Sequence, residues 1–331
     1  MVRAAGLERI VEEMPGEETI GRMGHKVQHA LHGAVLKGGE PARKVADALH
    51  GTWLGHPLHP VLTDITIGAW VMAGVFDVIA AATGDRRAAW AGDMLLGIGT
   101  AAAVPTALAG MADYSTAPKR ASRDATVHGV LNAAVFGLNA ASLAQRRRGA
   151  CGVGRALSWA GLGLAAVSAW LGGRLVYRHK VGVDHSEQFG ESARHWRAVM
   201  EESDLPERTP VRVEVEGKGV LLYREDGEVF AIGAVCAHAG GPLEQGKFEG
   251  GCVQCPWHQS VYDLRTGGIV HGPTTHPQPR FDTRVVDGRI EVRLMSEREA
   301  ERGTRIGAVE GGRRMPVTLR DASGGAGAFL A

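Results

Sequence analysis

Two short cysteine–histidine pairs constrain what this chain can fold into more than any other feature. The first pair is Cys236-Ala-His238, and the second, after sixteen residues, is Cys255-Pro-Trp-His258. Each pair lies among glycine and proline, so each is expected at the tip of its own tight turn. Thiolate with imidazole suits either a tetrahedral zinc ion or a mixed-ligand [2Fe–2S] cluster. Zinc sites usually space their histidines more widely and place them on a helix, so the pattern favours the cluster and leaves zinc as the alternative.

The sequence around these pairs reads CAHAGGPL in the first loop and CPWHQSVYDLRTG in the second. Both stretches resemble the loops of the Rieske family, and the resemblance covers about 211–294. It implies a small all-β domain that holds one [2Fe–2S] cluster. It also implies the ligands, with two cysteines on the inner iron and two histidines on the outer, exposed iron: Cys236, Cys255, His238 and His258.

The second loop carries two hydroxyl side chains that distinguish groups within this family. Quinol-oxidising members have serine and tyrosine where this chain has Ser260 and Tyr262, and both hydroxyls donate hydrogen bonds to cluster sulfur or to the cysteine thiolate. Those members also join the two loops by a disulfide, and Gly241 and Trp257 stand at its positions here. The resemblance therefore implies that the two hydroxyls tune the reduction potential without a bridging disulfide. Ordinary packing of both side chains is the alternative.

Two other loop positions and the ligand types add further expectations. Gln259 follows the second histidine where the family usually has glycine, so the tip of this loop is expected to differ. Gly272-Pro273 and Pro277-x-Pro279 resemble the family's third, proline-containing loop, which shields the cluster. Neutral imidazoles in place of two thiolates reduce the negative charge on one iron, so the potential should exceed that of all-cysteine clusters.

Four apolar segments precede the cysteine–histidine pairs. Each has about the twenty residues that a helix needs to cross a bilayer core, and short charged links join them. A soluble alanine-rich bundle is the alternative, but it would need polar outer faces at helical period, and the fourth segment has none before Arg174. The sequence therefore predicts a membrane bundle with helices at about 62–82, 92–112, 126–144 and 156–177.

The stretch before the first of these segments reads His56-Pro-Leu-His59-Pro60. This His-Pro-x-His-Pro motif resembles that of the small four-helix membrane domains of the DUF2231 type, and the resemblance covers about 53–184. It implies the fold and the membrane location, and it brings no established chemistry.

Four polar residues near the starts of the first and third segments could meet at one face of the membrane. They are His56, His59, Asp64 and His128. Such a group could hold a haem, a quinone headgroup or a metal ion. The alternative is a structural role, in which the imidazoles hydrogen-bond to backbone carbonyls at the interface.

An even number of spans puts both ends of the chain on one side of the membrane. Eight basic residues flank the helices on that side, and six, including Arg146, Arg147 and Arg148, lie in the opposite loops. Because basic residues favour the cytoplasmic side, the sequence predicts a protein of a bacterial-type inner membrane with its Rieske-like region in the cytoplasm.

The remaining parts of the chain are polar. Thirty-seven basic and 36 acidic residues nearly cancel, which argues against a nucleic-acid partner. Composition predicts an amphipathic segment over 1–52, a linker over 185–210 and a flexible tail over 295–331. The chain is therefore expected to be multi-domain, with an α-helical transmembrane four-helix bundle followed by a small all-β iron–sulfur domain.

The expected function is single-electron transfer at a membrane, between a quinol or flavoprotein donor and an unidentified acceptor. The competing hypothesis is a redox sensor that regulates the membrane bundle without enzymatic turnover. A self-sufficient oxygenase would need two histidines and a carboxylate for a mononuclear iron in a further large domain. Asp47, His50 and His56 have the wrong spacing for that iron, and no histidine follows residue 294, so this function is not expected.

Overall fold

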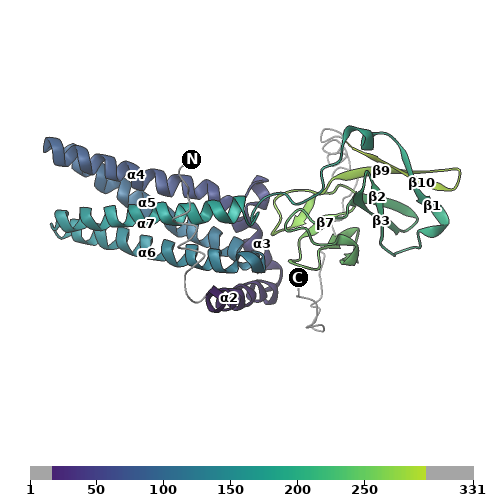
Figure 1. Ribbon diagram of the computed structural model, residues 1–331, viewed down its shortest axis with the longest axis horizontal. Coiled ribbons are helices and arrows are strands. Elements are labelled where there is room, and N and C mark those ends of the chain that lie inside the picture. Colours follow the sequence, from purple (N-terminus) through teal and green to yellow (C-terminus); the bar gives the residue numbers. More distant parts are fainter. Residues whose placement is uncertain (1–16, 296–331) are drawn as a thin grey trace. The chain divides into compact units, whose positions relative to one another are not determined.

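The computed structural model describes residues 17–295 of the chain. These residues form two compact units, one helical and one rich in β-strands (Figure 1). The helical unit joins the chain up to Gly38 with Pro57–Val181, and the β unit joins Gly39–His56 with the chain from Gly182. The predicted tail over 295–331 lies, apart from its first residue, outside the described part.

Four long helices make up most of the helical unit and run side by side (Figure 1). They extend beyond the predicted apolar segments because capping residues set their ends. Asp85 accepts a 2.8 Å hydrogen bond from the N–H of Arg87, and Gly84 ends the preceding helix in the left-handed conformation. Within the described residues, these are the helices long and apolar enough to cross a membrane. They are α4 (Leu58–Thr83), α5 (Arg86–Ser115), α6 (Ser122–Arg147) and α7 (Cys151–Tyr177).

The bundle is apolar outside and partly polar inside. Large apolar side chains point outward, among them Ile65, Val78 and Ile98, which are 53%, 55% and 48% exposed. A soluble bundle has the opposite arrangement, because water favours polar outer faces. The four helices therefore form a membrane domain whose outer surface suits lipid. Polar side chains are instead buried between the helices: Thr66, Asp77, Thr106, Asn139, Ser142, Arg146 and Ser168.

The bundle consists of two helical hairpins that share one packing pattern. Three glycines of α5 are seven and eleven residues apart, and three glycines of α7 repeat that spacing. At each of them the facing helix is so close that an added Cβ would lie within 3.2 Å of it. The facing side chains keep the same spacing in reverse order, so the second hairpin repeats the first. The matched contacts are Gly92–Asp77, Gly99–Trp70 and Gly110–His59 in one hairpin, and Gly154–Arg146, Gly161–Asn139 and Gly172–His128 in the other.

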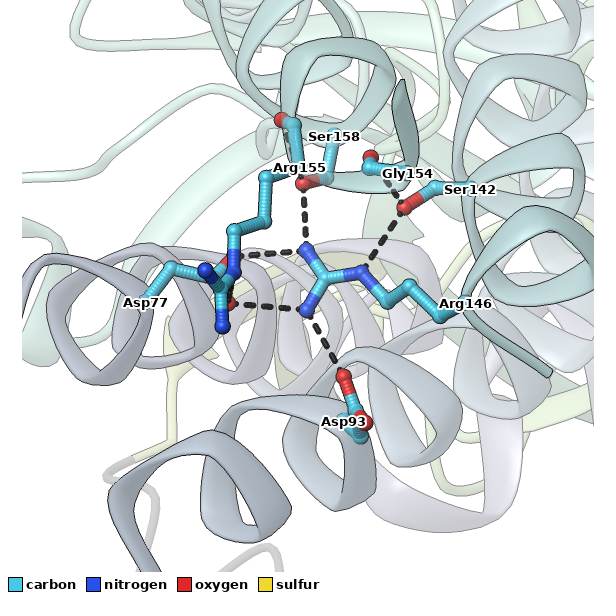
Figure 2. Close-up of polar contacts among 7 residues, drawn as sticks. All are labelled: Asp77, Asp93, Ser142, Arg146, Gly154, Arg155 and Ser158. Carbon is cyan, nitrogen blue, oxygen red and sulfur yellow. Dashed lines mark hydrogen bonds and ion pairs between the residues drawn. The ribbon is translucent and has the colours of Figure 1, made fainter. Parts of the chain in front are cut away.

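A buried charge cluster joins all four helices at one end of the bundle (Figure 2). The guanidinium of Arg146 donates to both oxygens of Asp77, at 2.8 and 2.5 Å, to Asp93 at 2.8 Å and to the hydroxyl of Ser158 at 2.8 Å. Arg155 lies 3.3 Å from Asp77. The first hairpin thus supplies two carboxylates and the second two guanidiniums, so the two hairpins neutralise each other. Arg146, expected in a loop, is instead buried because it closes this cluster.

The predicted polar segment over 1–52 is divided between the two units. Helix α2 (Glu17–Lys37) packs on the bundle, where the hydroxyl of Ser122 donates to the amide oxygen of Gln28 at 2.6 Å. Helix α3 (Gly39–His50) belongs to the β unit. Composition could not indicate this division, because both helices are polar and amphipathic and differ only in what they contact.

Two antiparallel sheets form the β unit, with strand orders β1-β10-β9-β4-β3-β2 and β5-β6-β7-β8. The predicted linker over 185–210 contains the edge strand β1, whose short, charged sequence lacks a clear period-two pattern. The larger sheet has β1 (Arg197–Glu201), β2 (Val211–Val215), β3 (Lys218–Glu225), β4 (Glu228–Gly233), β9 (Arg280–Val286) and β10 (Arg289–Leu294). The smaller has β5 (Lys247–Glu249), β6 (Cys252–Gln254), β7 (Val261–Asp263) and β8 (Ile269–His271).

Two hairpin turns in the larger sheet follow the sequence pattern Asp-Gly. Asp226-Gly227 joins β3 to β4, and Asp287-Gly288 joins β9 to β10. All four residues have positive φ, from 50° to 80°, as a two-residue hairpin turn of type I′ requires. These turns fix the register of both hairpins.

Strand β3, which lies between β4 and the edge strand β2, is buried on both faces. Leu221 and Tyr223 belong to a core that also contains Cys236 and Cys255, while Val220 and Leu222 face a second core. Both cysteines are therefore anchored in the hydrophobic interior of the β unit rather than in exposed loops.

Candidate iron–sulfur site

The two cysteine–histidine pairs occupy two turns of the same construction. The first turn follows β4, and the second lies between β6 and β7. In each, the cysteine N–H donates to the carbonyl five residues further on, and the N–H four residues on donates to the cysteine carbonyl. Both pairs therefore lie in tight turns, as predicted. The bonds are Cys236 to Gly241 (2.8 Å), Gly240 to Cys236 (2.9 Å), Cys255 to Ser260 (2.8 Å) and Gln259 to Cys255 (3.1 Å).

The two ligand types have different surroundings. Cys236 and Cys255 are 1% and 2% exposed, whereas His238 and His258 are half-buried, with ring centroids 4.9 Å apart and an angle of 78° between the planes. Hydrogen bonding with the Cys255 thiol lowers the pKa of Cys236 to about 7, and the same contact together with burial raises the pKa of Cys255. Two sulfurs inside and two imidazoles nearer the surface match the arrangement that the Rieske resemblance implies.

The two hydroxyls of the second loop are buried beside the cysteines. The Tyr262 hydroxyl lies 3.2 Å from the Cys236 sulfur, and burial followed by the Cys236 charge raises the pKa of Tyr262, so it stays a donor. Ser260 is fully buried, and its Oγ has no hydrogen-bond partner among the residues that the structure describes. An unsatisfied buried hydroxyl costs about 1–3 kcal/mol. Both side chains therefore fit a bound group that presents sulfur acceptors, as a [2Fe–2S] cluster does.

Gln278 is a buried residue of this site that the sequence did not single out. It lies between two prolines in the third loop and is 4% exposed. With the amide oriented to satisfy its neighbours, its oxygen accepts from the N–H of Ala237 (2.7 Å), and its nitrogen donates to the carbonyl of Val235 (3.1 Å). The same oxygen lies 3.3 Å from the hydroxyl oxygen of Tyr262, whose one proton is directed at the Cys236 sulfur. Gln278 thus ties the third loop to the first, and the flanking prolines were the only signal of it.

The positions of the family's bridging disulfide are filled by close packing. An added Cβ on Gly241 would lie 2.8 Å from the Cys255 sulfur and 3.1 Å from the indole of Trp257. Trp257 packs against the core that contains both cysteines. Glycine is therefore needed at 241 so that the second loop can approach the first, and the indole holds the loops together where no disulfide exists.

Gln259 lies at the tip of the second loop with φ of 63°, a left-handed conformation that favours glycine. Its amide oxygen accepts hydrogen bonds from Arg43 of α3 and from Gln254, both at 3.1 Å. These two bonds compensate the backbone strain and hold the tip in place.

Helix α3 also holds the third loop. Asp47 accepts from the N–H of Gly272 at 2.8 Å, and its other oxygen lies 2.8 Å from Nδ1 of His271. Pro273 follows directly, so this carboxylate fixes the start of the segment expected to shield the cluster. Both carboxylate oxygens of Asp47 are thereby engaged, one by a backbone N–H and the other by an imidazole.

The four polar residues of the predicted membrane-face group have different surroundings. His59 and His128 lie in the bundle with ring centroids 6.4 Å apart. Asp64 is exposed and lies about 140° around α4 from His59. His56 is exposed and belongs to the β unit. His59 and His128 each place Nδ1 2.9 Å from a backbone carbonyl, of Thr106 and Ser168 respectively, which are the structural bonds considered above.

Comparison with protein families gives two matches along the chain. Residues 195–282 match the Rieske [2Fe-2S] domain, and residues 55–185 match the predicted membrane protein family DUF2231. The first match includes β1, within the stretch expected to be a linker, and the second coincides with the four-helix bundle. The two matches thus fall on the two parts of the chain that the sequence motifs distinguished.

Several known proteins resemble about 30% of this chain. The anthranilate 1,2-dioxygenase ferredoxin subunit of Burkholderia cepacia is 33% identical over 99 residues, which are 30% of this chain and 92% of that protein. The naphthalene 1,2-dioxygenase ferredoxin component of Pseudomonas putida is 30% identical over 99 residues, covering 30% and 95%. Among solved structures, the carbazole 1,9a-dioxygenase ferredoxin of Nocardioides aromaticivorans IC177 is 28% identical, covering 30% and 98%, with a TM-score of 0.29.

Proposed function

The chain belongs to the Rieske [2Fe–2S] family, and we propose that it works as a membrane-anchored carrier of single electrons. The observation that carries this proposal is the meeting of two cysteines and two histidines in paired tight turns beside the hydroxyls of Ser260 and Tyr262. The apolar bundle is the anchor in this proposal, because its outer surface suits lipid.

Each part of the site has its own task in this proposal. The Cys236 and Cys255 thiolates hold the inner iron, and the half-buried His238 and His258 hold the outer one. A [2Fe–2S] cluster supplies reversible one-electron storage. The imidazoles offer electrons the shortest route to a docked partner, and their outer nitrogens can release or take up a proton as the charge of the site changes. Pro273 and Gln278 limit water access from the third loop.

The donor and acceptor are proposed by chemical class. The relatives named above are ferredoxin components of dioxygenase systems, so a flavoprotein donor and an oxygenase acceptor are one pair to test. The hydroxyls of Ser260 and Tyr262 favour a higher potential, and a membrane anchor gives access to quinol as a second donor. Reduction of the purified protein by each donor, followed optically, decides between them.

The function is tested on full-length protein purified anaerobically from membranes. Iron and sulfide should be present at the level of one [2Fe–2S] cluster per chain. Dithionite should produce a rhombic EPR signal with a lower mean g than all-cysteine clusters give. Stoichiometric zinc without iron would instead favour the closed metal site that the ligand types alone allow.

A redox sensor is the second candidate function, supported by α3. This helix contacts both the second and the third loop through Arg43 and Asp47, so a change at the cluster could alter its position. In a sensor, reduction of the cluster would change how readily a protease cleaves the segment Thr52–His56, which follows α3. A sensor would also transfer no electrons to any acceptor. A carrier would turn over with an acceptor protein or an artificial acceptor at rates that depend on the cluster.

Removal of either hydroxyl is predicted to lower the reduction potential. A hydrogen bond to a sulfur ligand stabilises the reduced, more negative cluster more than the oxidised one. A bond worth about 1.4 kcal/mol corresponds to about 59 mV for one electron, so Tyr262→Phe and Ser260→Ala should each lower the potential by roughly that amount.

Redox titration followed by EPR measures the shift. Tyr223→Phe, a buried tyrosine stacked on Phe248, is the matched control and should titrate with the wild type. If the reduction potential is unchanged in all three variants, the two hydroxyls contribute only to packing and do not tune the potential.

We infer that the β unit lies on the cytoplasmic side, although two of the basic residues near the helix ends are paired within the bundle. Arg146 is buried in the charge cluster, and Arg174 pairs with Asp124 at 3.2 Å, so neither counts as a free loop charge. The other basic residues still lean toward the side of the β unit. A phosphatase active only in the periplasm should therefore be active when inserted at Gly149, between α6 and α7, and inactive when fused after Arg293. The reverse pattern would invert the topology.

A further inference from the structure

Two imidazoles occupy matching positions in the two hairpins of the bundle. His59 of α4 lies against Gly110 of α5, and His128 of α6 lies against Gly172 of α7. A Cβ added at Gly110 would come within 2.8 Å of the His59 ring, and one added at Gly172 within 3.2 Å of the His128 ring. Both hairpins therefore keep a glycine where an imidazole needs room, which is a repeated feature of the bundle.

The hydrogen bonds of both imidazoles determine which ring nitrogen carries the proton. Nδ1 of His59 lies 2.9 Å from the carbonyl oxygen of Thr106, and Nδ1 of His128 lies 2.9 Å from that of Ser168. A carbonyl oxygen can only accept, so Nδ1 is the donor in both rings. In a neutral imidazole, Nε2 then keeps its lone pair. Histidines that bind metals commonly donate their other ring N–H to a backbone carbonyl in this way.

The two rings have the separation of a pair bound to one metal ion. Helices α4 and α6 both contact α5 and α7, so the histidines reach from diagonal helices into the bundle. Their centroids are 6.4 Å apart, and their planes are perpendicular. At metal–nitrogen distances of about 2.0 Å, two imidazoles on opposite sides of one ion have centroids roughly 6.3 Å apart.

We propose that His59 and His128 are the two axial ligands of a haem iron in the membrane domain. Two protein ligands suffice for haem because the macrocycle fills the other four positions of the iron. Its apolar rings suit the interior of a bundle whose outer surface already faces lipid. The neighbouring side chains of α5 and α7 at this level are small: Ala103, Thr106, Ala109, Ala165 and Ser168.

Asn132 contacts the ring nitrogen of His128 that this proposal assigns to iron. Its amide nitrogen lies 3.0 Å from Nε2 of His128, four residues earlier on α6. The amide donates there, so it holds His128 in the tautomer that a metal needs. Iron would take over the same lone pair, with the Asn132 amide moving to another rotamer. Asn132→Ala should therefore retain haem.

The test uses full-length protein produced in cells supplied with a haem precursor and purified from membranes. The pyridine haemochromogen assay should find one haem b per chain, and the ferric protein should give the EPR signal of a low-spin haem. His59→Ala and His128→Ala should each lose most of this haem. Their Rieske EPR signal should remain, because that cluster lies in the other unit, and this signal reports that the chain is folded. The haem assay therefore tests the haem proposal, and the Rieske EPR signal independently tests the cluster assignment.

Two further variants keep the test decisive if an alanine variant does not accumulate. His128→Met should retain haem with a higher reduction potential, because methionine–histidine ligation raises it. His29→Ala, on α2, is the matched control and should keep haem content and spectrum. Wild-type protein that contains no haem, even after incubation with haemin, would overturn the proposal. So would an unchanged haem content in both alanine variants or an unchanged spectrum in His128→Met, and the imidazoles would then only bridge helices.

Discussion

Cys255→Ser protein is expected to lose the [2Fe–2S] cluster completely. Cys255 lies in the core of the β unit, 2% exposed, with its N–H and carbonyl both bonded within the second loop. A serine hydroxyl would fit there sterically, but it ionises far less readily than a thiol and is a poorer ligand for iron. The inner iron would keep one protein ligand, so iron content and the rhombic EPR signal should both disappear.

Cys252→Ser is the matched control for this prediction. Cys252 is buried three residues earlier, on β6, opposite Asp263 of β7. Burial, with a smaller contribution from Asp263, raises the pKa of Cys252 to about 11, so the thiol is neutral and unreactive. The variant should keep the cluster with an unchanged signal. A signal that survives in Cys255→Ser, or one lost in Cys252→Ser, would contradict the ligand assignment.

Arg146→Ala is expected to destabilise the membrane bundle strongly. The guanidinium is 3% exposed and contacts side chains from all four helices (Figure 2). Without it, the contact left to the Asp77 carboxylate, 2% exposed, among residues 17–295 is the one with Arg155 at 3.3 Å. Removing one partner of a buried ion pair lowers the free energy of unfolding by about 3–5 kcal/mol. Denaturation in detergent, followed by helical circular dichroism, measures this loss.

Two comparisons show whether the loss comes from the buried charge. Arg147→Ala removes the neighbouring, exposed arginine and should change the free energy of unfolding by less than about 0.5 kcal/mol. Asp77→Ala combined with Arg146→Ala should recover part of the stability, because no unpaired charge stays at the centre of the cluster. If Arg146→Ala unfolds with the wild type, the cluster contributes nothing measurable to holding the hairpins together.

The sequence by itself determined the two parts of the chain and their types. Four apolar stretches of bilayer length predicted the helices, because the hydrophobic thickness of a membrane sets a minimum length that few soluble segments reach. Cys236, His238, Cys255 and His258 predicted a metal-binding pair of turns, because ligand chemistry and glycine-rich loops are local properties. The turn at Asp226-Gly227 likewise depends on a local property, the conformations that these two residues allow.

The tertiary structure alone decided which distant residues meet. The sequence indicated that Arg146 is one of three arginines in a loop. It becomes the centre of a buried cluster because it binds the carboxylate of Asp77, 69 residues earlier in the chain. In the sequence, Asp47 was notable only for having the wrong spacing for an iron ligand. In the structure it contacts His271 and Gly272, and these contacts place α3 on the β unit. Gln278 likewise could be recognised as part of the site only once the structure showed the first loop and Tyr262 beside it. In each case the polar partner lies far away in sequence, and no local propensity reports a contact formed by packing.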